Sequence, residues 1–82
     1  MKEIVYTRNA LRALRRMPAN VAARIRAKVQ QYAADPASLA NNVTELKGRD
    51  GIRLRVGDWR VIMEDGIVLA VLEIGPRGGI YE

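Results

Sequence analysis

The sequence has 82 residues, a length that fits one small domain rather than two. Its 14 basic and 9 acidic residues give a net charge of +5, and most of the basic residues are arginine, whose planar guanidinium suits nucleic acid or an acidic protein. Because the chain has no cysteine and no histidine, its composition excludes disulfides, thiolate chemistry, zinc hydrolysis and serine–histidine catalysis.

The first half of the chain is predicted to be mostly helical. Ile4-Val5-Tyr6 is apolar and rich in β-branched residues, which predicts a first strand over about residues 2–6. Thr7 can then cap a helix that ends at Pro18, and a second helix is predicted over residues 19–34. Both segments carry apolar residues at three- and four-residue spacing. The short connection between them therefore predicts an antiparallel helical hairpin.

From about residue 44 the period of the apolar residues changes from 3.6 to 2, which predicts a sheet. Four strands are expected, over residues 44–47, 52–56, 59–64 and 67–74. Gly57-Asp58 and Asp65-Gly66 are each typical of a two-residue hairpin turn. The sequence therefore predicts an α+β fold in one domain over residues 1–82, with a strand, two helices and an antiparallel meander.

The two turns predict which side chains share a face of the sheet. Gly57-Asp58 places Arg55 directly opposite Arg60, and Asp65-Gly66 places Arg60 opposite Val71. The face assigned to the helices is then apolar and carries Ile52, Leu54, Val56, Trp59, Val61, Met63, Val68, Ala70, Leu72 and Ile74. The other face carries Arg53, Arg55 and Arg60 beside Ile62, Leu69, Val71 and Glu73.

The arginines on this second face are the first candidate site. Like charges placed opposite each other destabilise a sheet by up to ~1 kcal/mol, so Arg53, Arg55 and Arg60 favour a bound anion that relieves the repulsion. A solvated face, neutralised in part by Glu64 and Glu73, is the alternative.

The glycine-rich end of the chain is the second candidate. Gly75, Gly78 and Gly79 allow residues 75–82 to fold back over the edge of the sheet, which would bring Arg77 and Tyr81 towards the arginine face. A tyrosine that only anchors the tail is the alternative.

Four motifs follow the helical hairpin in order: Glu45-Leu46-Lys47-Gly48, Ile52-Arg53-Leu54-Arg55, Gly57-Asp58-Trp59-Arg60-Val61-Ile62 and Ile74-Gly75-Pro76-Arg77, the last followed by Tyr81. In this order and spacing the chain resembles the RelE/ParE superfamily of toxins from bacterial toxin–antitoxin systems. The resemblance implies a five-stranded sheet packed against two helices, and a toxin held inactive by an antitoxin.

For the RelE branch, the resemblance implies ribosome-dependent cleavage of mRNA, with catalytic positions that match Arg53, Arg60, Arg77 and Tyr81. The hypothesis is a metal-free and cofactor-free endoribonuclease, in which the 2′-hydroxyl attacks phosphorus, arginines stabilise the developing charge and Tyr81 accepts the proton. Further RNA contacts are expected from basic residues, namely Arg55, Lys47 and Arg49.

The expected partners are the ribosome, mRNA and an acidic or amphipathic antitoxin in a hetero-oligomer. Ile62, Ile67 and Leu69 are predicted to be exposed beside the arginines and to receive the antitoxin. With no apolar run long enough for a membrane and no signal-peptide core, we expect a cytoplasmic protein. Two other functions stay open: a ParE-like poison of DNA gyrase, and a noncatalytic nucleic-acid-binding module.

Overall fold

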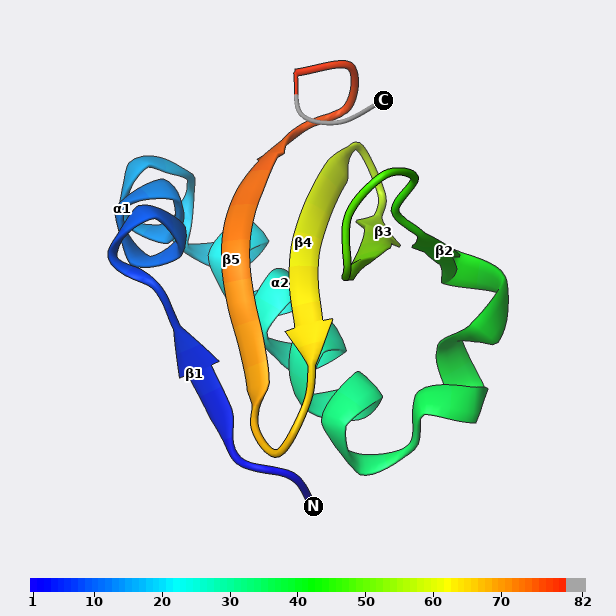
Figure 1. The fold of residues 1–82 in the computed structure, drawn as a ribbon. Coiled ribbons are helices and arrows are strands. Elements are labelled where there is room, and N and C mark those ends of the chain that lie inside the picture. Colours follow the sequence, from blue (N-terminus) through cyan, green and yellow to red (C-terminus); the bar gives the residue numbers. More distant parts are fainter. Residues whose placement is uncertain (80–82) are drawn as a thin grey trace.

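The computed structural model describes residues 1–79, which form a five-stranded sheet with helices on one of its faces (Figure 1). The elements in chain order are β1 (Ile4–Tyr6), α1 (Arg8–Arg16), α2 (Ala19–Ala34), the 3-10 segment η1 (Pro36–Asn42), β2 (Val43–Glu45), β3 (Ile52–Val56), β4 (Trp59–Asp65) and β5 (Leu69–Pro76). In space the strands run β1-β5-β4-β3-β2, with β1 parallel to β5 and the other neighbours antiparallel. The α+β architecture predicted from the sequence is confirmed.

Both predicted helices form, and the first is capped as expected. The Thr7 side-chain oxygen accepts a hydrogen bond from the Ala10 backbone N–H at 3.2 Å, while its hydroxyl donates to the Leu72 carbonyl at 2.6 Å. The cap therefore also attaches the start of α1 to β5. Within residues 1–79, no helix has the length and apolar character needed to cross a bilayer.

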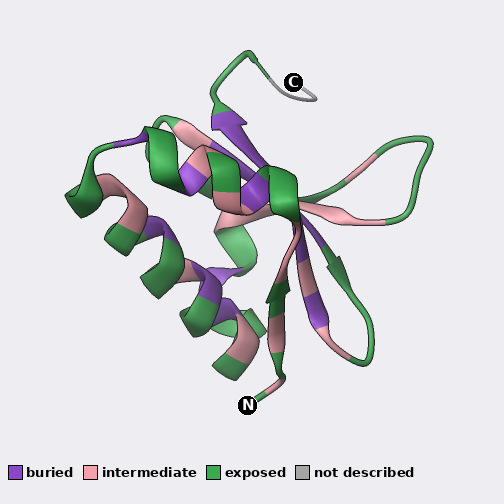
Figure 2. Cartoon of the chain, turned by 90° about the vertical axis from the view of Figure 1, so that its left-hand side faces the viewer, coloured by how far each residue is buried: buried purple, intermediate pink, exposed green. Residues whose placement is uncertain are grey.

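The core lies between the helices and the inner face of the sheet, where the buried segments of both layers face each other (Figure 2). Fully buried side chains from the two layers meet there, among them Ile25, Val29, Leu54, Val61 and Met63. Segment η1 was not predicted as a helix. It packs against this core through Leu39, which is only 4% exposed.

Strand β5 departs from the predicted register. The β4–β5 loop spans residues 66–68, because Asp65 pairs with Leu69, so the predicted two-residue turn is wrong. Further along, Ile62 pairs with Glu73 but Met63 pairs with Val71, which leaves Leu72 as the extra residue of a β-bulge.

The longer loop and the bulge change which side chains of β5 face the helices. Leu69 and Val71 belong to the core, and the prediction that Val68, Ala70 and Leu72 face the helices instead is wrong. Ile74 lies after the bulge and faces the core as predicted. Arg60 therefore pairs with Gly75 rather than with Val71.

Candidate functional site: an arginine-lined cleft

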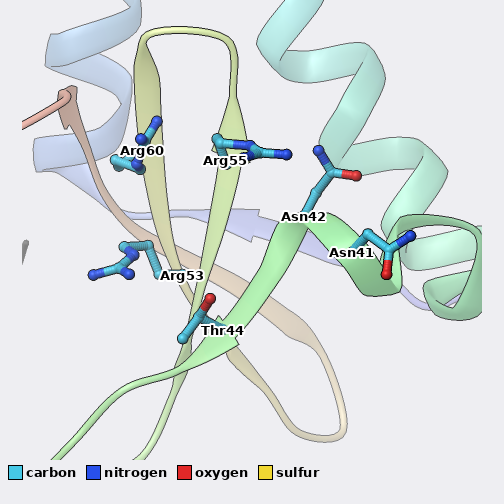
Figure 3. A pocket seen from close by; sticks show the side chains of 6 residues that line it. All are labelled: Asn41, Asn42, Thr44, Arg53, Arg55 and Arg60. Carbon is cyan, nitrogen blue, oxygen red and sulfur yellow. The ribbon is translucent and has the colours of Figure 1, made fainter.

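Three arginines from β3 and β4 meet at one cleft on the sheet face turned away from the helices. The Gly57-Asp58 turn forms as predicted and places Arg55 directly opposite Arg60, while Arg53 pairs with Ile62. The cleft has a volume of about 160 Å³ and is lined by Asn41, Asn42, Thr44, Arg53, Arg55 and Arg60 (Figure 3). The predicted gathering of arginines is thus a feature of the structure.

Arg60 is held by the turn that joins β3 to β4. Its side chain is largely buried, with 8% of the residue exposed, and one guanidinium nitrogen donates to the carbonyls of Gly57 and Trp59 at 3.0 Å each. Gly57 has a φ of +59°, in the left-handed region that glycine adopts without strain. The turn therefore fixes the position of a permanently charged group before any anion arrives.

The opposite wall of the cleft comes from the end of η1 and from β2, and the sequence analysis did not identify it. Asn41, Asn42 and Thr44 line this wall, and Thr44 pairs with Arg53 across the β2–β3 ladder. Residues 44–47 were predicted as a strand, but without a turn of known type the sequence did not give its register. Among the described residues, no acidic side chain lines the cleft.

Arg77 lies close to the same turn without lining the cleft. Its backbone N–H donates to the Asp58 carbonyl at 2.7 Å, which joins the chain after β5 to the β3–β4 turn, and Arg77 is exposed there. The structure thus brings Arg77 next to the turn that holds Arg60. Tyr81 lies outside the described residues.

Comparison with known protein families identifies the family of this chain. Residues 4–81 match the family described as the ParE toxin of the type II toxin–antitoxin system parDE. The chain belongs to this family. No curated protein sequence matches it.

Solved structures similar to the toxin come from RelE proteins. The archaeal RelE–RelB complex from Pyrococcus horikoshii contains a chain with 25% identity and a TM-score of 0.80, covering 95% of this chain and 97% of that one. A chain of the Methanococcus jannaschii RelB–RelE complex has 19% identity and a TM-score of 0.73, with 95% of each chain covered. The isolated E. coli RelE toxin has 17% identity and a TM-score of 0.76, covering 94% of this chain and 85% of that one. These matches confirm the predicted place in the RelE/ParE superfamily.

The structure does not bring Lys47 and Arg49 to the cleft of the toxin. Both are exposed in the β2–β3 loop, which joins β3 at Ile52, the end remote from the Gly57-Asp58 turn. Arg49 instead lines a separate hollow of about 500 Å³ that includes acidic side chains, namely Glu45, Asp50, Glu64 and Asp65. The lining of the cleft therefore gives no support to the prediction that Lys47 and Arg49 contact RNA.

The prediction that three apolar residues form one exposed surface beside the arginines is wrong. Leu69 is fully buried because the register of β5 turns it to the helices, and Ile62 is fully buried between Arg53 and Glu73 on the neighbouring strands. Ile67 is 98% exposed, but it lies in the β4–β5 loop at the far end of β4 from Arg60.

Two tyrosines among the described residues have shifted pKa values, and neither lines the cleft. Burial raises the pKa of Tyr6, although the Arg26 guanidinium, 5.2 Å from the centre of the ring, opposes the shift. Burial also raises the pKa of Tyr32, and the Asp65 carboxylate adds to that effect. Within residues 1–79, no group of three or more acidic side chains is arranged to hold a metal ion.

Proposed function

We propose that this toxin cleaves mRNA on the ribosome, with the arginine cleft as the site that holds the scissile phosphate. One observation carries the proposal: Arg53, Arg55 and Arg60 face one cleft from adjacent strands, and Arg60 is fixed there by the β3–β4 turn. Guanidinium groups that are already in place can stabilise negative charge as it develops, without reorganising during the reaction. The structural likeness to RelE toxins supports the same assignment.

The proposed reaction uses the RNA's own 2′-hydroxyl as the nucleophile. Its oxygen attacks the adjacent phosphorus, the bond from phosphorus to the 5′-oxygen breaks, and the products are a 2′,3′-cyclic phosphate and a 5′-hydroxyl end. Arg60 and Arg53 would stabilise the charge on the non-bridging oxygens, and Arg77, joined by its backbone to the turn, would hold the phosphate near the leaving oxygen.

Tyr81 is proposed to accept the proton of the 2′-hydroxyl. A tyrosine with a pKa of ~10 is only ~0.1% ionised at pH 7, so it needs neighbouring positive charge to act as a base. The leaving 5′-oxygen takes a proton from water, and Tyr81 returns its proton to the solvent, which completes the reaction. A general base typically accelerates such a step ~10²–10⁴-fold.

The ribosome and the antitoxin are the proposed partners. The cleft is small and open, so we expect bound mRNA and the ribosome to complete the site, and the isolated protein to cut free RNA poorly. Solved relatives are toxins in complex with RelB, and an acidic antitoxin segment would neutralise the cleft arginines. Exposed Ile67 stays a candidate for an antitoxin contact away from the cleft.

Poisoning of DNA gyrase is the second candidate, because the matched family carries the ParE name. Expression of the toxin in growing cells followed by mapping of mRNA 5′ ends separates the two. The nuclease predicts new 5′-hydroxyl ends within translated codons, which disappear in Arg60→Ala. A DNA-damage response with intact mRNA, and growth arrest that survives Arg60→Ala, would instead establish gyrase poisoning. Binding to RNA without any new ends, and with a steep dependence on salt, would indicate a noncatalytic module.

A further inference from the structure

One wall of the cleft is lined by uncharged polar side chains that have no role in the proposed cleavage reaction. Asn41, Asn42 and Thr44 line the same space as the arginines, and Figure 3 shows the Asn42 amide beside Arg55. Within residues 1–79, these three side chains make no hydrogen bond to any other group of the protein. Asn42 is nevertheless half-buried, and Figure 3 shows Arg55 extending from β3 towards it.

The local backbone fixes this wall in place. Asn42 is the last residue of η1, and the next backbone N–H, that of Val43, donates to the Ala40 carbonyl before the chain enters β2. Leu39 anchors η1 in the core, and Thr44 is held by its pairing with Arg53. The backbone therefore sets the positions of these side chains before a ligand binds, as a recognition site requires.

The chemistry of these side chains matches a nucleobase better than a phosphate. A phosphate presents only acceptors, so it would use the N–H groups of an amide and leave its carbonyl oxygen without a partner. A base edge presents donors and acceptors together, and adenine offers one of each, N6–H and N7, at the spacing of an asparagine amide. Single-stranded RNA exposes such edges when its bases are unstacked.

From this arrangement we infer that Asn42, flanked by Asn41 and Thr44, forms a nucleobase subsite that selects adenine next to the phosphate in the arginine cleft. The inference rests on the proposed function, since it assigns RNA to that cleft. It adds a source of sequence preference within the protein itself, because the proposed role of the arginines is to bind the phosphate, which every nucleotide shares.

Two measurements test the subsite. In the first, ribosomes carry mRNAs that differ in one nucleotide, either the one before the cut or the one after it. The cleavage efficiency is compared for A, C, G and U at each of these positions. In the second, purified toxin is titrated with 2′-O-methyl trinucleotides that cannot be cut, with each base in turn at the centre. Each measurement uses the wild type, Asn42→Ala and Asn20→Ala, the last a matched change at an exposed asparagine in the first turn of α2.

We expect wild type and Asn20→Ala to favour adenine by about 5- to 150-fold, the range of one bidentate amide–base pair, and Asn42→Ala to lose that preference. Adenine-selective binding without cleavage would support the proposed subsite and contradict the proposed nuclease activity. Cleavage or binding that shows no preference, or a preference that Asn42→Ala retains, would overturn the subsite; where cleavage persists, the nuclease stands.

Discussion

Arg55 lies directly opposite Arg60 across the β3–β4 hairpin, although like charges in that position repel. Arg60 cannot turn away, because the Gly57 and Trp59 carbonyls hold its guanidinium. The sheet therefore places two positive charges on neighbouring strands at the cleft, an arrangement that a bound phosphate would stabilise.

The opposition of Arg55 and Arg60 predicts that a variant can gain stability while it loses activity. Arg55→Thr should raise the free energy of unfolding by up to ~1 kcal/mol, since it removes the repulsion and places a good strand former in β3. The same change should weaken binding and cleavage of RNA. Urea unfolding at low and high salt measures the first effect, and the stability gain should shrink at high salt because ions screen the repulsion. An unchanged or lower stability of Arg55→Thr at low salt would contradict this account.

Arg60 is expected to be the most sensitive of the cleft arginines. Arg60→Lys keeps the charge but cannot reproduce the geometry of a guanidinium that bonds two carbonyls and still faces the cleft. Cleavage of ribosome-bound mRNA should fall ~10²–10³-fold, and the free energy of unfolding should fall by about 1–3 kcal/mol. Arg15→Lys, the same change on the exposed part of α1, is the control and should alter neither. Wild-type cleavage by Arg60→Lys would show that a point charge suffices.

The left-handed backbone at Gly57 predicts a cost for any side chain there. Gly57→Ala should lower the free energy of unfolding by about 1–2 kcal/mol, because a Cβ is strained at a φ of +59° even though it meets no atom closer than 3.9 Å. Gly66→Ala is the matched control, since Gly66 is in the other hairpin loop and does not have a positive φ. Thermal unfolding of both variants checks the difference, and equal stabilities would contradict it.

Tyr32 predicts a loss of stability in alkaline solution. Burial, aided by the Asp65 carboxylate, raises its pKa in the folded state, so the folded protein holds the phenol proton more tightly than the unfolded chain does. The contribution to stability is therefore complete below pH ~10, the usual pKa of tyrosine, and falls as the pH rises above it. Unfolding measured from pH 8 to 12 should decline less steeply in Tyr32→Phe than in the wild type. Identical slopes would show that Tyr32 does not contribute.

The proton acceptor is tested by removing one oxygen. Tyr81→Phe should reduce cleavage of ribosome-bound mRNA by ~10²–10⁴-fold, the usual contribution of a general base, with folding and RNA binding nearly unchanged. Tyr6→Phe, in β1, provides a control for the loss of a phenol elsewhere. If Tyr81→Phe cleaves at the wild-type rate, Tyr81 is not the base, and neither Glu45 nor Glu73, the other acidic candidates in the sequence, lines the cleft.

Strong local signals made much of the fold predictable. Thr7 and Pro18 mark the limits of the first helix, residues 19–34 carry the period of the second, and Gly57-Asp58 gives the register of β3 and β4. That turn is also why the opposition of Arg55 and Arg60 could be derived from the sequence alone.

The misplaced elements depend on contacts distant in the sequence. Asp65-Gly66 has the composition of a tight turn, yet the loop contains three residues and the bulge at Leu72 shifts the register again. The carbonyl of Leu72 accepts a hydrogen bond from the hydroxyl of Thr7, which is distant in the sequence. Asn41 and Asn42 are the last residues of an irregular 3-10 segment that carries no hydrophobic period. The net charge could not show that Arg49 lies in the β2–β3 loop and does not line the cleft.

The parallel pairing of β1 with β5 has a consequence for the synthesis of this toxin. Strand β5 lies between β1 and β4, so the earliest strand remains without its neighbour until the segment from Leu69 onward has left the ribosome. Before then β1 has no partner strand, and the set β2–β3–β4 ends at an unpaired edge of β4. Translation that stops before β5 should yield inactive fragments. Only chains that include β5, and are therefore almost full length, should be toxic to the cell.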